Sequence, residues 1–106
     1  MSELPKAPDT HHEFVDRYPQ LGRAWELIAE AGRDGPLDEP TVRLVKLGIA
    51  IGAMREGSVH ASVRKAMAQG IPAEALDQVV ALSAGTIGLP ATVAAFTWVR
   101  DQLPGE

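Results

Sequence analysis

The segment from residue 37 to residue 70 constrains the fold of this chain most, because it reads as two helices separated by one sharp break. Asp38 is a good N-cap for the first of them, and Pro40 suits the first turn of a helix. The helix that follows, at residues 39–54, is apolar around much of its circumference. A helix of this kind is buried on several sides. The pattern therefore predicts burial in the core of the chain and against a neighbouring subunit.

The second helix of this segment is expected to begin just after Gly57, which favours a bend because it has no side chain. Ser58 would cap this helix, and Gly70 would end it. Apolar residues at helical spacing predict four further helices, at residues 11–17, 19–31, 73–86 and 91–103. No stretch reads as a strand. We therefore predict an all-α bundle with an antiparallel helix pair at its centre.

The length of 106 residues fits one domain. Two prolines and mixed charges near the N-terminus predict a mobile arm at residues 1–9, and the single helical domain would occupy residues 10–106. The first 14 residues lack the apolar stretch of a signal peptide. No apolar run approaches the length of a membrane span. A cytoplasmic protein without membrane contact is expected.

Charge and cysteine content exclude several classes of function. The net charge is −4, with 14 acidic and 10 basic residues spread along the chain. No basic block of the kind that binds phosphate backbones is present, so a nucleic-acid partner is not expected. The chain has no cysteine, which excludes disulfides, thiolate metal sites and catalysis by a thiol.

Several short motifs follow one another in an order that points to a family. They are Leu37-Asp38-Glu39, the apolar stretch at residues 44–54, Gly70, Ala73-Glu74, and Thr86-Ile87-Gly88-Leu89-Pro90-Ala91. Over residues 37–103 the chain resembles the carboxymuconolactone decarboxylase and alkylhydroperoxidase D (AhpD) family. The resemblance implies an AhpD-like helical bundle. It also implies a homotrimer or homohexamer, in agreement with the apolar surplus of the central helices.

The resemblance also locates the family's thiol site, and this chain differs at every position of it. With the register set from Gly70, the two cysteine positions fall on Arg55 and Ser58, the histidine position on Ser62, and the glutamate position on Arg43. Serine cannot replace a redox thiol, and arginine is not a base near neutral pH. A peroxidase of the alkylhydroperoxidase type, which needs the Cys-x-x-Cys pair, is therefore disfavoured.

His60 and Glu56 are the candidate catalytic residues. They are four residues apart and share one helix face if the helix includes both, so that the carboxylate can orient the imidazole in a proton relay. The favoured alternative for this pair is an ordinary ion pair on the helix surface. The pair could supply two metal ligands, but the sequence shows no third, and no metal is expected. His60 and Ser62 lie about 200° apart on a helix, so one cannot replace the other unless the register slips.

Arg55, Ser58 and Ser62 are the candidate substrate-binding residues. A guanidinium binds a carboxylate in bidentate fashion, so Arg55 is the better anion-binding candidate. The alternative for Arg55 is compensation of a helix dipole. Arg43 lies near the same face but about 18 Å away along the helix, too far for joint action. Lys46 interrupts the apolar helix. Three alternatives are open for its side chain: it reaches solvent, it pairs with an acid at a subunit contact, or it enters a pocket.

These observations give one leading function and one alternative. The leading prediction is a cysteine-free relative of carboxymuconolactone decarboxylase that binds or converts a small carboxylate or lactone by acid–base chemistry, without a cofactor. A carboxy-lyase-like activity would use Arg55 to hold the anion and His60 to move a proton. The alternative is a non-catalytic oligomeric helical protein that binds a ligand or serves as a scaffold.

Overall fold

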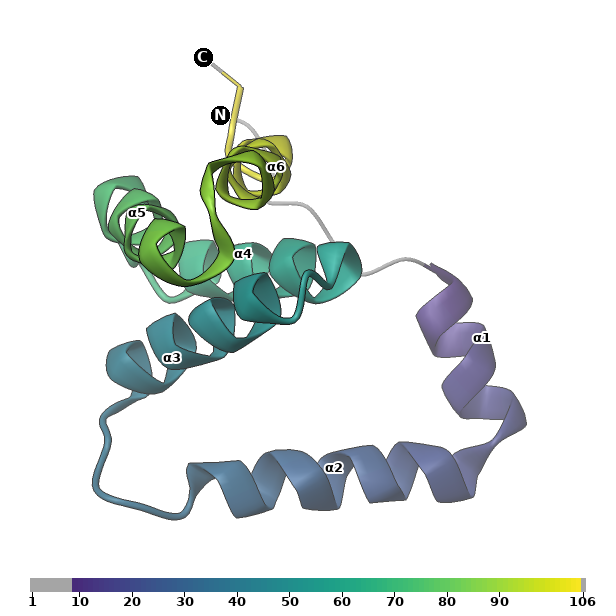
Figure 1. Cartoon of the computed structure of the whole chain (residues 1–106). Helices are drawn as coiled ribbons and strands as arrows, with labels where there is room; N and C mark the ends of the chain where they lie inside the picture. Colours follow the sequence, from purple (N-terminus) through teal and green to yellow (C-terminus); the bar gives the residue numbers. More distant parts are fainter. Residues whose placement is uncertain (1–8, 106) are drawn as a thin grey trace. The chain divides into compact units, whose positions relative to one another are not determined.

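The computed structural model describes residues 9–105, and these residues form an all-helical structure (Figure 1). The six helices are α1 (Asp9–Arg17), α2 (Pro19–Arg33), α3 (Glu39–Gly52), α4 (Glu56–Ala68), α5 (Ala73–Ile87) and α6 (Leu89–Asp101). No strand occurs among the described residues. The prediction of an all-α protein is confirmed. Within the same residues, no helix is both long enough and apolar enough to cross a membrane.

The chain divides into two compact units, one with α1 and α2 and the other with α3 to α6. In the first unit α1 packs against α2, and the rings of Phe14 and Tyr18 lie 5.3 Å apart. No residue of either helix is buried. The apolar stripe predicted on α2 is therefore open in this single chain: Leu21, Trp25 and Ile28 are all exposed. Of the predicted arm, residues 1–8 lie outside the described residues, and Asp9 already belongs to α1.

The second unit holds the hydrophobic core. In it α3 packs against α4 and α5, and α6 packs against the same two helices (Figure 1). The fully buried large side chains at the centre are Leu47, Ile51, Val59, Val63, Leu76 and Val99. The core faces of α3 and α4 thus meet, but Val45 and Ile49 on α3 are exposed, so in this single chain α3 is not buried all round. Asp38 caps α3 as expected, because its Oδ1 accepts a hydrogen bond from the Thr41 backbone N–H at 2.9 Å.

The break between α3 and α4 lies at Met54, which corrects the prediction of a break at Gly57. Met54 has a φ of 55°, and Gly57 lies inside α4. The backbone N–H of Arg55 donates to Ala50 and that of Met54 donates to Ile51. This is the Schellman pattern that ends helices at a left-handed residue. Ser58 therefore does not cap α4, since Arg55 occupies the N-cap position.

Glycines with a positive φ end the next two helices. After α4, Gly70 has a φ of 78°, its N–H donates to Met67, and the N–H of Ile71 donates to Ala66. This second Schellman pattern confirms the predicted role of Gly70. Gly88, with a φ of 84° and a ψ of 162°, separates α5 from α6. Pro90 follows it in the first turn of α6, where a missing N–H does no harm.

Candidate functional site

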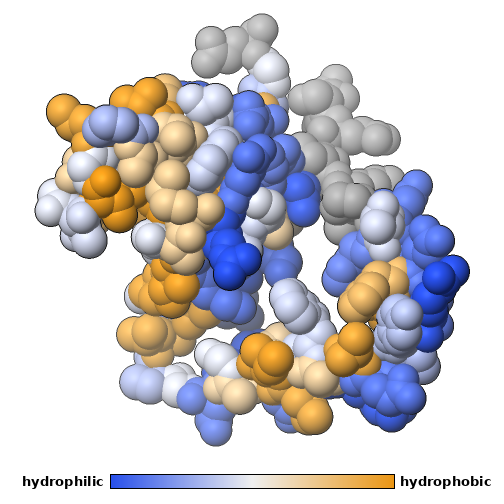
Figure 2. Space-filling model, turned by 45° about the vertical axis from the view of Figure 1, so that its right-hand side comes forward, coloured by the Kyte–Doolittle hydropathy of each residue, from blue (hydrophilic) through white to orange (hydrophobic). Residues whose placement is uncertain are grey.

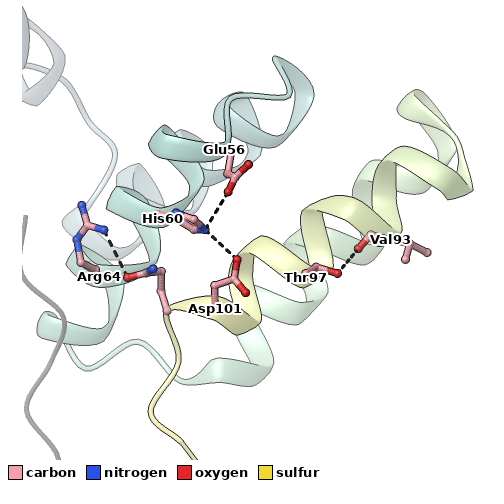
Figure 3. Close-up of polar contacts among 7 residues, drawn as sticks. Glu56, His60, Arg64, Val93, Thr97 and Asp101 are labelled. Carbon is pink, nitrogen blue, oxygen red and sulfur yellow. Dashed lines mark hydrogen bonds and ion pairs between the residues drawn. The ribbon is translucent and has the colours of Figure 1, made fainter. Parts of the chain in front are cut away.

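His60 on α4 lies between two carboxylates (Figure 3). Its Nε2 is 3.1 Å from Oδ2 of Asp101 and 4.0 Å from Oε2 of Glu56. The His60 side chain is 20% exposed, whereas Glu56 and Asp101 are 57% and 46% exposed. Both carboxylates thus face the same ring nitrogen, with only Asp101 within hydrogen-bond distance, and part of the ring still reaches solvent.

Local helix geometry and the packing of α6 build this arrangement. Glu56 and His60 are four residues apart on α4, so their side chains meet on one face, as predicted. Asp101 is the last residue of α6, and α6 packs along α4. Asp101 was not among the predicted residues, because it is 41 residues away from His60 and no local pattern marks it. Only the tertiary contact brings it to the imidazole.

The same three residues form a set that could hold a divalent cation. One ligand atom from each of Glu56, His60 and Asp101 can be chosen so that all lie within 4.8 Å of one another. Imidazole nitrogen and carboxylate oxygen are suitable ligands for zinc and for similar transition metals. Asp101 is thus the candidate third ligand that the sequence did not reveal. The arrangement is chemically able to share a proton or to bind a cation.

Arg64 places a positive charge one turn further along α4 from His60 (Figure 3). Its guanidinium Nη1 donates to Oε1 of Gln102 at 3.4 Å, in a partly buried contact between α4 and the end of α6. Residues four apart on a helix share a face. Arg64 therefore adds a positive charge on the face of α4 that carries His60 and its two carboxylates. Sequence reasoning missed Arg64, although its spacing from His60 was a usable signal.

The predicted residues Ser58 and Ser62 do not join His60. Each is two residues from it on α4, which turns its side chain about 200° away. Ser62 is buried, with 6% of its surface exposed, and it packs at the core face of the helix beside Val59 and Val63. Ser58 is exposed. The structure thus separates these two serines from the pair Glu56 and His60.

Among the described residues, no side-chain hydrogen bond or ion pair joins Arg55 or Arg43 to His60. Arg55 occupies the N-cap position of α4, just after the end of α3, and its side chain is exposed. Arg43 lies on α3 and is partly buried. Its Nε is buried without a hydrogen-bond partner among the described residues. Burial lowers the pKa of the Arg43 guanidinium.

Comparison with known proteins identifies the family. The chain matches the family model described as "Carboxymuconolactone decarboxylase family" over residues 19–101. No match was found among curated proteins or among solved structures. The matched residues include all of α2 to α6, and hence the core and each residue of the candidate site. This chain of six helices therefore belongs to the carboxymuconolactone decarboxylase family.

Proposed function

We propose that this protein binds a small carboxylate or lactone on the face shared by α4 and α6, and that His60 moves a proton there. The observation that carries the proposal is the imidazole of His60, which is held by Asp101 and faced by Glu56 while remaining one-fifth exposed. A carboxylate that accepts a hydrogen bond from an imidazole fixes the orientation of the ring. The absence of cysteine directs the chemistry away from sulfur.

The proposed reaction is an acid–base step on a carboxylated lactone or a related acid. In a decarboxylation, the bond to the carboxylate carbon breaks, carbon dioxide leaves, and the electron pair stays on the substrate as an enolate. A nearby cation stabilises this developing charge. Arg64 is the cation on the same face of α4 as His60, and Arg55 is the second candidate. Protonated His60 then delivers its proton to the enolate carbon and regains one from solvent.

The test is a turnover screen of the full chain on lactone acids. His60→Ala should lower turnover by about 100-fold or more, which is the usual contribution of a positioned acid–base group. Arg64→Gln and Arg55→Ala, assayed separately, should raise KM if either cation holds the carboxylate. His12→Gln is the matched control, because His12 is exposed on α1. Equal turnover for the wild type and His60→Ala would overturn the proposal.

A second candidate function is an oligomeric binding or scaffold protein without catalysis. The observation that favours it is a groove of about 560 Å³ between α3 and α5, lined mostly by apolar residues, with Gly48 and Gly52 among them. Leu82 beside this groove is 71% exposed. Figure 2 shows hydrophobic side chains on the surface of both units of the chain. We propose that a homotrimer or homohexamer covers such surfaces. Unchanged turnover in every His60 variant would favour this function.

A further inference from the structure

The side chains of Glu56, His60 and Asp101 converge where α4 meets the end of α6 (Figure 3). We propose that these three residues bind a divalent transition-metal ion, and that Zn²⁺ is preferred over Mn²⁺ and Mg²⁺. The sequence predicted no metal because Glu56 and His60 offer only two ligands. Asp101 supplies the third ligand from a position 41 residues away from His60 along the chain. The three residues are called the ligand triad below.

The distances between the ligand atoms fit a single ion bound by all three side chains. His60 Nε2 is 3.1 Å from Asp101 Oδ2 and 4.0 Å from Glu56 Oε2. Zinc bonds of about 2.0–2.2 Å in tetrahedral geometry place two ligand atoms about 3.3–3.6 Å apart. The two observed distances lie on either side of this range. The ligand oxygens of Glu56 and Asp101 lie within 4.8 Å of each other, so an approach of no more than about 1.5 Å completes the set.

The ligand triad carries negative charge that the described residues do not balance. Both carboxylates face Nε2 of His60, but this nitrogen can donate only one proton, and only Asp101 is within hydrogen-bond distance. No lysine or arginine forms an ion pair with Glu56 or Asp101 among residues 9–105. Two carboxylates at such close range repel one another. A divalent cation bound by both removes this repulsion.

The end of α6 gives a separate reason for a cation at this place. Asp101 is the last residue of α6, where unpaired backbone carbonyls give the helix a partial negative charge that favours cations over carboxylates. The basic residue of this last turn, Arg100, is paired with Asp77, with its Nη2 3.0 Å from Oδ2. An ion bound by Asp101 is therefore stabilised by the helix end as well as by the side chains.

The ligand triad is accessible, and its atoms select the kind of ion. The two carboxylates are about half exposed, so an ion can reach the triad from solvent. An imidazole nitrogen with carboxylate oxygens suits Zn²⁺, and the affinity of such sites rises from Mn²⁺ to Zn²⁺. Mg²⁺ prefers oxygen ligands alone and retains its water. Three protein ligands leave a coordination position that solvent can fill.

Arg64 opposes the binding of a cation and makes the sign of one effect a test. It lies one turn after His60 on α4, and its guanidinium donates to Gln102. Because like charges repel, Arg64→Gln should tighten the binding of Zn²⁺. If the contact with Gln102 only supported the packing of α4 and α6, the same variant would bind Zn²⁺ no better than the wild type.

The inference goes beyond the proposed function, and only one consequence rests on that function. The lone pair of Nε2 that binds Zn²⁺ cannot accept a proton at the same time. Zinc should therefore inhibit any turnover that depends on His60. Zinc binding without inhibition would contradict the proposed role of His60 in proton transfer and leave the ligand triad in place. Turnover that depends on His60, without zinc binding, would contradict the ligand triad alone.

The experiment is a calorimetric titration of the metal-free full chain with ZnCl₂, MnCl₂ and MgCl₂ at constant ionic strength. We expect saturable binding of Zn²⁺, weaker binding of Mn²⁺ and the weakest binding of Mg²⁺. His60→Ala, Glu56→Gln and Asp101→Asn should each weaken Zn²⁺ binding by about tenfold or more, because even the outer partners of metal ligands contribute that much. Far-UV circular dichroism checks that each variant is folded. Zinc should raise the melting temperature of the wild type but not that of His60→Ala.

His12 on α1 provides the matched control. His12 and Asp16 are four residues apart on an exposed helix, as Glu56 and His60 are on α4, but no third ligand joins them among the described residues. His12→Gln should therefore bind Zn²⁺ as the wild type does. Tighter binding of Mn²⁺ with the same variant losses would support the ligand triad and identify Mn²⁺ as the better ion. No saturable binding of Zn²⁺, wild-type affinity in both His60→Ala and Asp101→Asn, or an equal loss in His12→Gln would overturn the proposal.

Discussion

Gly88, in the turn between α5 and α6, offers a quantitative test of the physical reasoning about this fold. Its φ of 84° and ψ of 162° lie in a region that is essentially restricted to glycine. A Cβ placed at this position meets no atom within 4 Å. The cost of Gly88→Ala is therefore conformational and not steric. We expect a loss of about 1–3 kcal/mol of unfolding free energy.

Gly85, three residues earlier, is the matched control. It lies inside α5, and a Cβ there also meets no atom within 4 Å. Alanine in a helix interior is more stable than glycine by about 0.5–1 kcal/mol. The same chemical change should thus stabilise the protein at Gly85 and destabilise it at Gly88. Together the two effects separate the variants by about 1.5–4 kcal/mol.

The assay is urea unfolding followed by far-UV circular dichroism, with all variants at the same protein concentration. Gly70→Ala extends the series, because Gly70 has a φ of 78° and a methyl group added there would enter open space. Alanine in this left-handed conformation should lower the unfolding free energy by about 1–2 kcal/mol. The m-value should stay constant across the series, since the surface exposed on unfolding is unchanged. If Gly88→Ala proves as stable as Gly85→Ala, the assignment of the cost to backbone conformation is wrong.

Two further predictions concern acid stability and assembly. Hydrogen bonds from the side chain and then the backbone of Thr41 hold the pKa of Asp38 below its ordinary value of 3.8. The ionised Asp38 carboxylate therefore stabilises the folded state above pH 3.8, and this stabilisation is lost as the pH falls through the lowered pKa of the folded state. In Asp38→Ala the unfolding free energy should fall less steeply with decreasing pH in this acid range. An unchanged pH dependence in the variant would contradict the prediction. Leu82→Glu should convert the proposed oligomer to a smaller species in light scattering. A monomeric wild type, or an unchanged mass in the variant, would refute this second prediction.

Local signals were sufficient to predict much of the fold. The Asp38 cap, the closing Gly70 and the apolar spacing of α3 and α5 depend on residues within one or two turns of each other, and all of them are found in the structure. The break before α4 was misplaced because glycine was the stronger local signal. The structure instead places Met54 in the left-handed conformation, where backbone hydrogen bonds to Ala50 and Ile51 close the helix.

The candidate site was only half predictable from the sequence. Glu56 and His60 were identified because a spacing of four residues on a helix fixes their proximity. Asp101 was not, since its contact with His60 depends on the packing of α6 along α4. The separation of His60 from Ser62 followed from helix geometry alone, and the burial of Ser62 agrees with it. A single sequence does not show which distant helix end will contact a given side chain.

The position of Arg43 connects the family resemblance with the charge distribution of this chain. The register set from Gly70 predicts that Arg43 stands at the position of the family's glutamate, which would reverse the charge there. A carboxylate at this position can accept a proton in a thiol relay, whereas a guanidinium remains charged and acts only as a donor. Lys46 and Lys65 extend the positive charge around it. The exchange of a glutamate for an arginine that this register predicts would remove a base from the helix pair, in agreement with the lack of cysteine in the chain.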